Sequence, residues 1–149
     1  YKNLFTDSAV TVGIGNITSH KVKLIEVTIA SLDLAIEQVK PGNYIGDIGR
    51  AVESLAKSNN FSVVKVLVGH GVGYAVHEEP NIPNYEEKNR GAQMRTGMVL
   101  AIEPMLTMGS DKVKLHKDGF GYETIDGSLS AHFEHTIAVT ENGNLVLTK

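Results

Sequence analysis

The stretch "VGHGVGYAVHEEPNIPNY" (residues 68–85) concentrates polar chemistry in a glycine-rich setting, unlike a strand built only for packing. His70 and His77 lie seven residues apart, and two glutamates and two prolines follow. On a regular strand an odd spacing points two side chains to opposite faces. Gly71 and Gly73 permit a bulge or a sharp bend, which would let both histidines point into one cavity. One histidine could then bind a metal ion while the other contacts a substrate. Because a lone histidine is more often structural, this pairing stays a hypothesis.

The segments on either side of this stretch predict an α+β domain. Residues 3–13 are typical of a strand or the end of a hairpin. One helical stripe is expected after Thr18 or Ser19, formed by Val22, Ile25, Ile29, Leu32, Ile36 and Val39. A second helix is expected near Asp47, with Ile48, Val52 and Leu55 facing inward. Strands are expected over residues 61–69, 98–108 and 130–140, a hairpin arm near 112–119, and a closing strand after "ENGN".

The bulk properties limit the classes of protein that the chain can belong to. Its 149 residues suffice for one domain with a core, and its net charge of −3 does not favour a nucleic-acid or membrane-surface binder. The absence of cysteine excludes disulfides and thiolate metal sites and is compatible with a cytosolic protein. We find no membrane-length apolar run and no signal peptide. The chain begins without methionine, as if in the middle of a hairpin, so we expect it to be part of a longer gene product.

Three carboxylates lie in otherwise apolar segments. Glu103 occurs in "VLAIEPML", Glu134 in "AHFEHTIAV" and Asp7 in "LFTDSAVTV". A carboxylate buried in an apolar strand is costly unless it meets a cation or takes up a proton. For any one of the three alone, a solvated face or a structural salt bridge is the more ordinary explanation. Their joint occurrence with His70 weakens that explanation.

Together these side chains form a set of hard oxygen ligands with one imidazole. Such a set suits Mn, Fe(II), Co or Zn, and a carboxylate can also bridge two ions, as in two-metal hydrolytic sites. The other histidines have more ordinary interpretations. His20 in a first helical turn and His116 in a hairpin arm are expected to be exposed. His132 shares the expected strand face of Glu134, so a supporting role beside the ligands stays open for it.

Several segments together resemble the methionine aminopeptidases of the bacterial, type I kind. They are "TDSAVTVG", "VKPGNYIGDIG", "GHGVGYAVHEEPNIPNY", "GMVLAIEPM" and "DGSLSAHFEHTIAVTENG", and they cover essentially the whole chain in the right order. The wider family includes prolidase and aminopeptidase P, which resemble "GHGVG" and "IEP" but usually differ around the last glutamate. The resemblance implies a pita-bread (creatinase/aminopeptidase) fold of the α+β class, with two helices packed on a curved antiparallel sheet.

The resemblance also implies a site. Asp7, His70, Glu103 and Glu134 would be metal ligands, with Asp7 and Glu134 bridging two ions. Glu103 would act catalytically by handling the proton of the attacking water, and His77 by contacting the scissile amide of the substrate. The implied reaction is hydrolytic removal of the initiator methionine from nascent polypeptides.

Three departures from the family pattern modify these expectations. A fifth metal ligand, an aspartate, and a further histidine would fall before Tyr1, so residues 1–149 would be the C-terminal part of one catalytic domain, without its N-terminal part. We therefore expect at most one tightly bound ion and little or no activity for this chain alone. Val76 and Phe120 replace a phenylalanine and a tryptophan that would line the methionine pocket. Thr6 replaces a glycine, with no evident consequence.

Two alternatives remain at the level of the sequence. One is a prolidase-like or aminopeptidase P-like metallopeptidase of the same fold, and the other is a metal-free binding protein. Every ligand position inside the chain is filled, which favours catalytic ancestry. The expected partners are N-terminal methionine residues of peptides and nascent proteins, the ribosome and the missing N-terminal half of the fold, with no DNA and no membrane. A cytoplasmic location follows from that substrate and the absence of targeting.

Overall fold

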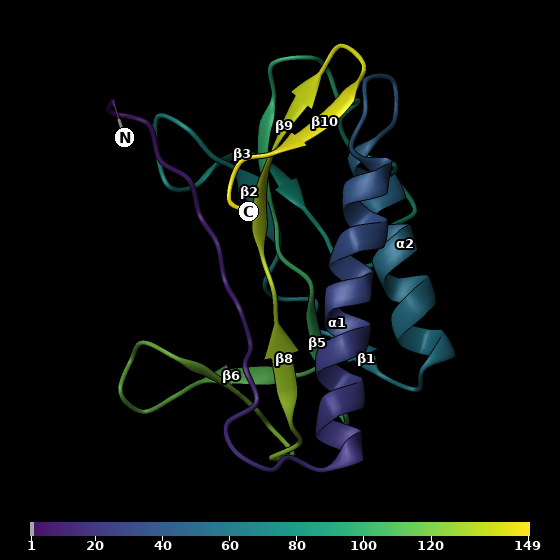
Figure 1. The fold of residues 1–149 in the computed structure, drawn as a ribbon, viewed down its shortest axis with the longest axis vertical. Coiled ribbons are helices and arrows are strands. Elements are labelled where there is room, and N and C mark those ends of the chain that lie inside the picture. Colours follow the sequence, from purple (N-terminus) through teal and green to yellow (C-terminus); the bar gives the residue numbers. More distant parts are fainter. Residues whose placement is uncertain (1) are drawn as a thin grey trace.

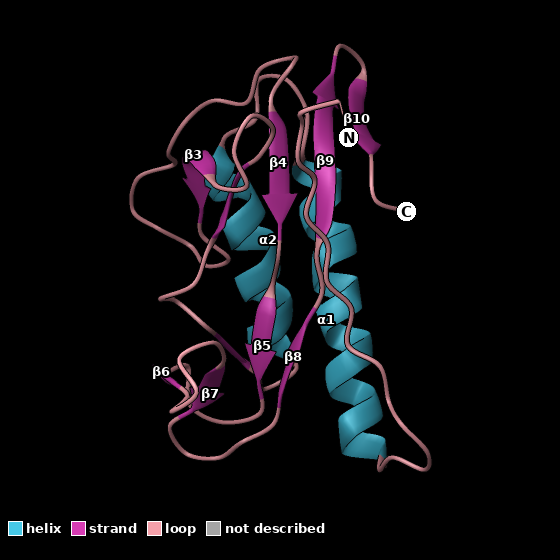
Figure 2. Cartoon of the chain, turned by 90° about the vertical axis from the view of Figure 1, so that its left-hand side faces the viewer, coloured by secondary structure: helices cyan, strands magenta, loops and turns pink. Residues whose placement is uncertain are grey.

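Two helices lie against one side of a set of antiparallel strands in the computed structural model, which describes residues 2–149 (Figures 1 and 2). The helices α1 (Ser19–Gln38) and α2 (Ile45–Ser58) pack on each other. The strands are β1 (Ser62–Val63), β2 (Gly69–Gly71), β3 (Glu78–Ile82), β4 (Val99–Ile102), β5 (Met105–Thr107), β6 (Val113–Leu115), β7 (Tyr122–Thr124), β8 (Ser130–His132), β9 (His135–Thr140) and β10 (Gly143–Val146). The expected α+β class is confirmed.

The described strands form three antiparallel sheets. The largest has the order β10-β9-β4-β2-β3, a second has the order β1-β5-β8, and β6 pairs only with β7. The hydrophobic core lies between the two larger sheets and the helices and includes the fully buried Ile48, Ile82, Leu100, Leu106 and Ile137. Among residues 2–149 we find no helix whose length and apolar character would let it cross a lipid bilayer.

The helix α1 begins where predicted, but the expected apolar stripe is wrong in part. Val22 and Ile29 are 37% and 39% exposed. The buried face is instead formed by Leu24, Val27, Thr28, Ser31, Leu32 and Ala35. Two of these residues are polar, and their hydroxyls donate to the carbonyls one turn earlier, from Thr28 to Leu24 at 2.7 Å and from Ser31 to Val27 at 2.8 Å. Small residues satisfied in this way can face the core although hydrophobicity alone predicts the opposite.

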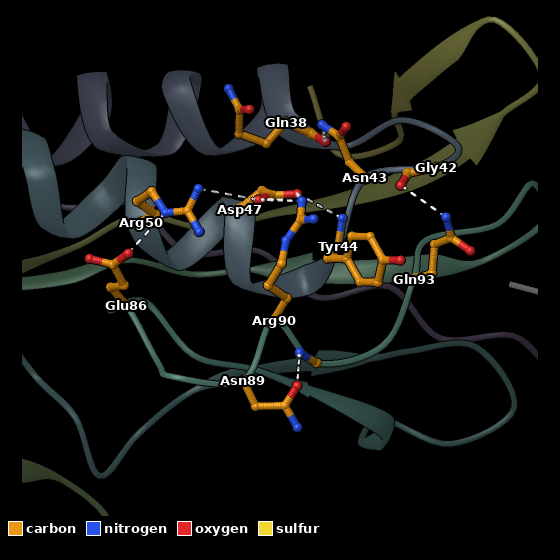
Figure 3. A network of polar contacts seen from close by, with 11 residues as sticks. Gln38, Gly42, Asn43, Tyr44, Asp47, Arg50, Glu86, Asn89, Arg90 and Gln93 are labelled. Atoms are coloured by element: carbon orange, nitrogen blue, oxygen red, sulfur yellow. Dashed lines mark hydrogen bonds and ion pairs between the residues drawn. The ribbon is translucent and has the colours of Figure 1, made fainter.

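The N-terminus of α2 is tied to the loop that follows β3 (Figure 3). Arg90 donates to both oxygens of Asp47 at 3.0 and 2.8 Å and lies 4.1 Å from the centre of the Tyr44 ring. The N–H groups of Ile45 and Gly46, which have no partner inside the helix, donate to carbonyls of residues 92 and 90. Burial tends to raise the pKa of Asp47, but the Tyr44 N–H and the Arg90 charge outweigh it and hold the pKa below its ordinary value. The free N–H groups at the start of α2 are therefore satisfied by backbone carbonyls of the loop that follows β3.

Two of the expected strands are each interrupted once, at matching positions. Residues 98–108 divide into β4 and β5 at Glu103-Pro104, and residues 130–140 divide into β8 and β9 at Phe133-Glu134. Pro104 lacks the N–H that a continuous ladder needs. The antiparallel register is the same on both sides of the break, since Ile102 pairs with His135 and Met105 with His132. This register places Glu103 opposite Glu134.

Residues 3–13 do not form the expected strand. The segment, purple in Figure 1, runs beside β9 and β8, and its one backbone bridge joins Ala9 to Glu134. Two threonine hydroxyls make the contacts that backbone hydrogen bonds of a strand ladder would otherwise make. Thr136 Oγ1 accepts from the Asp7 N–H at 2.8 Å and donates to the Asp7 carbonyl at 2.7 Å. In the same way Thr11 Oγ1 accepts from the His132 N–H at 2.9 Å and donates to its carbonyl at 2.8 Å.

Candidate metal centre

His70 is a buried imidazole with one nitrogen left available. It lies on strand β2, between β4 and β3 in the largest sheet, and is 6% exposed. Its Nδ1 lies 2.9 Å from the Gly71 carbonyl oxygen, which only accepts, so Nδ1 carries the hydrogen. In the neutral ring Nε2 then holds a lone pair, and it lies 3.4 Å from Glu103 Oε1. A lone pair facing a carboxylate oxygen at this distance is an arrangement that a cation would satisfy.

The predicted bend between the two histidines is present. The chain turns back between β2 and β3, and the pairing register of these strands shifts between Gly69 and Gly71. The His70 and His77 ring centres lie 4.3 Å apart with a tilt of 55°. A Cβ added at Gly71 would lie inside the contact radius of the Glu79 carbonyl oxygen. The strands can therefore approach closely enough to bring the rings together only if this position has no side chain.

Three side chains bring potential ligand atoms within 4.8 Å of one another, those of Asp7, His70 and Glu134. They come from the N-terminal segment, from β2 and from the break between β8 and β9. Glu103 adjoins the group through its contact with His70. The structure thus brings together all four residues that the sequence predicted as ligands.

The carboxylate of Glu134 lacks partners for its charge. The side chain is 5% exposed, and its buried Oε1 has no hydrogen-bond partner in the described part of the chain. Burial, then the charges of Glu103 and Asp7, raise its pKa to about 8. Like charges opposite each other on neighbouring strands destabilise a sheet. A divalent cation would relieve both the burial and the repulsion, so these residues fit a bound metal ion.

The metal-free chain should lose stability as the pH rises. The raised pKa of Glu134 means that between pH 4.5 and about 8 the folded state holds a proton that the unfolded state has released. The contribution of this proton is complete below pH 4.5 and is lost as the pH rises through about 8, with a slope of at most about 1.4 kcal/mol per pH unit. Urea unfolding in EDTA at several pH values would measure this decline in the free energy of unfolding. Saturating Mn²⁺ should remove the decline, and a flat profile in EDTA would contradict the prediction.

A cavity of about 380 Å³ opens beside the cluster. His70, His77, Glu103 and His132 form its polar side. Its apolar side is lined by Val64, Leu67, Val68, Met105, Val113, Tyr122 and Ala131. Tyr122 and Met105 could not be found from the sequence, because nothing in their local pattern shows that β5 and the β6–β7 hairpin meet at one cavity.

The two residues expected in the methionine pocket lie away from this cavity wall. Val76 precedes His77 in the turn and is 39% exposed, while Phe120, between β6 and β7, is 93% exposed. Neither is among the described lining residues of the cavity, so their role stays a prediction. The exposed His20 lies where expected, and the partly exposed His116 pairs with Asp118 at 2.8 Å.

The model of metallopeptidase family M24 matches residues 1–141. The chain belongs to this family. It is 47% identical over 143 residues to "Methionine aminopeptidase 1" of Bacillus subtilis (strain 168), covering 96% of this chain and 58% of that protein. It is 46% identical to a methionine aminopeptidase of Clostridium perfringens over 143 residues, with 96% and 57% coverage. The chain thus spans less than two thirds of the length of these relatives.

Solved structures confirm the M24 fold. The crystal structure of methionine aminopeptidase from Thermotoga maritima is similar with a TM-score of 0.96 and 44% identity, over 100% of this chain and 60% of that one. The prolidase from Pyrococcus furiosus is more distant, with a TM-score of 0.77 and 25% identity over 100% and 38%. The expected pita-bread fold is confirmed by these similarities. Membership of a metallopeptidase family implies divalent metal ions, and Asp7, His70 and Glu134 form a group that could hold one.

Proposed function

We propose that this chain carries the metal-binding part of an enzyme that hydrolytically removes the N-terminal methionine from peptides and nascent proteins. The observation that carries the proposal is that Glu103 lies opposite a buried Glu134, beside His70 and Asp7, and that Glu134 Oε1 has no hydrogen-bond partner among the described residues. The identity to relatives named methionine aminopeptidases supports this substrate over the prolidase-like alternative.

Asp7, His70, Glu103 and Glu134 would hold the ion, which we propose to be Mn, Fe(II), Co or Zn. The resemblance assigns two ions to an intact site, with Asp7 and Glu134 shared between them, and this chain alone would hold at most one tightly. When bound, a divalent ion polarises a carbonyl oxygen and lowers the pKa of water.

The other site residues would act on the substrate. Glu103 lines the cavity, and its carboxylate would take the proton from the attacking water. His77, whose tilted ring lies beside that of His70 at the same cavity, would contact the scissile amide. The apolar side of the cavity offers space for an unbranched thioether, and Val76 and Phe120 would complete the methionine pocket on substrate binding.

The proposed partners follow from this function. The missing N-terminal part of the fold would complete the second metal position, either in the same polypeptide or in trans. We further propose that the enzyme works in the cytoplasm on chains emerging from the ribosome, where initiator methionines first become accessible.

Metal titration tests the proposal directly. We expect calorimetry of the chain under anaerobic conditions, with Mn²⁺, Fe²⁺ or Co²⁺, to show one tight site that Glu103→Ala removes, because that change takes away one of the ligands. Two tight sites would contradict the one-ion expectation, and the absence of binding would contradict the ligand set.

The substrate is tested separately with a chimera. The chain is joined to the part of the Bacillus subtilis relative that lies outside the match, so that a complete site can form. The chimera is then offered a Met-Ala-Ser peptide and an Ala-Pro dipeptide. Release of methionine is expected, and cleavage of the second peptide alone would favour the prolidase-like alternative.

A further inference from the structure

The carboxylate of Glu103 lies between two imidazoles. Its Oε1 is 3.4 Å from His70 Nε2, and its Oε2 is 3.4 Å from His132 Nε2. The proposed function assigns a role to His70 but none to His132. Both histidines line the same cavity, and each faces a different oxygen of the Glu103 carboxylate.

The backbone of His132 is held more firmly than that of an ordinary residue at a strand end. Its N–H and its carbonyl both bond to the Thr11 hydroxyl, at 2.9 and 2.8 Å. On its other side His132 pairs with Met105 in the β5–β8 ladder. Thr11 belongs to the same N-terminal segment as Asp7, so one stretch of chain fixes both a proposed ligand and His132.

The Nε2 atom of His132 has no hydrogen-bond partner other than Glu103 within reach among the described residues. It is buried and makes no hydrogen bond there, and Glu103 Oε2 is the acceptor that it faces. The distance of 3.4 Å is slightly longer than that of an ordinary hydrogen bond, so the bond requires the two side chains to approach each other slightly. A buried imidazole nitrogen that already faces one carboxylate oxygen is poised to donate to it.

We propose that His132 is a positioning residue for Glu103. Its Nε2–H donates to Oε2 of the carboxylate and thereby directs Oε1 toward His70 and the ion. The inference rests on the proposed function, in which Glu103 is a metal ligand. Hydrogen-bond partners of ligating carboxylates typically change metal affinity by about 10- to 100-fold when removed.

The first test compares variants by calorimetry and by the visible absorption spectrum of bound Co²⁺. His132→Ala should lower Co²⁺ affinity by about 10- to 100-fold and change the spectrum while the number of bound ions stays the same. His132→Gln keeps a side-chain N–H donor and should restore affinity close to that of the parent chain. His135→Ala is the matched control, because the His135 Nδ1 lies 3.0 Å from the Thr148 hydroxyl and takes no part in the cluster.

Two results of this test would overturn the proposal. Unchanged affinity and spectrum in His132→Ala would mean that His132 does not orient Glu103. Loss of a bound ion that His132→Gln does not restore would make His132 a ligand itself. Melting temperatures of the metal-free variants show whether a loss comes from unfolding, and His132→Gln serves as the readout if His132→Ala does not fold.

A second test needs no metal and therefore separates this inference from the proposed function. Nitrogen-15 spectra of the metal-free chain should show that Glu103→Ala shifts the Nε2 resonance of His132 and leaves that of His135 in place. An unchanged His132 resonance would overturn the inference even if the chain binds metal. If the parent chain binds no metal, the ligand set fails, and this spectrum still decides whether His132 and Glu103 interact.

Discussion

Glu134→Gln should abolish tight metal binding and at the same time stabilise the metal-free chain. Glu134 is buried, its Oε1 has no described partner, and it lies opposite Glu103. Glutamine has the same shape, carries no charge and can donate to Glu103. We expect metal affinity to fall by more than about 100-fold, beyond the loss typical of residues that only support a ligand. At pH 8 the melting temperature in EDTA should rise by roughly 2–4 °C for each kcal/mol of relieved repulsion.

Calorimetry with Mn²⁺ and thermal unfolding in EDTA measure the two effects on the same samples. Glu141→Gln is the matched control, because Glu141 is exposed in the turn between β9 and β10 and should change neither quantity. If Glu134→Gln lowers the melting temperature in EDTA, the charge of Glu134 does not destabilise the metal-free chain as proposed. Retained tight binding would remove Glu134 from the ligand set.

Gly71→Ala should be among the most destabilising single-methyl changes in this chain. The added Cβ would overlap the Glu79 carbonyl oxygen and lie 2.9 Å from the carbonyl carbon. Both atoms belong to the backbone of β3, so no side chain can move aside. Overpacking usually costs about 1–3 kcal/mol, and we expect at least the upper end because two strands must separate. The separation would also move His70 away from His77.

Urea unfolding in EDTA would measure the loss. Gly73→Ala is a matched control in the same turn, since its Cβ would meet only the flexible Glu78 carboxylate at 3.9 Å. We expect this control to cost less than about 1 kcal/mol. If the two changes lower the free energy of unfolding equally, the close approach of β3 to Gly71 is not the cause of the loss.

The sequence predicts the elements of the site better than their arrangement. The glycines around His70 and His77 correctly indicate a bend, because a local pattern contains that information. The opposition of Glu103 and Glu134 depends on the pairing register of strands about thirty residues apart, which hydrophobic alternation does not specify. The family resemblance names both residues as ligands, yet it does not explain why the pKa of Glu134 is raised.

The wrong predictions have identifiable physical causes. The stripe on α1 is misplaced because Thr28 and Ser31 satisfy their own hydroxyls within the helix and can be buried. Residues 3–13 are held through the hydroxyls of Thr11 and Thr136 in place of a strand ladder, and a pattern of hydrophobic residues does not predict such contacts. The role of Tyr122 at the cavity depends on where the β6–β7 hairpin lies, which is a property of the assembled fold.

The hydroxyl contacts of the N-terminal segment also determine when the proposed centre can form during synthesis. Asp7 is held by Thr136, and 129 positions along the chain separate the two residues. A ribosome makes Asp7 long before it makes Glu134 and Thr136. The full set of proposed ligands can therefore assemble only after Glu134 has been translated. A filled centre would therefore show that the early-made segment around Asp7 has met the late-made segment around Glu134.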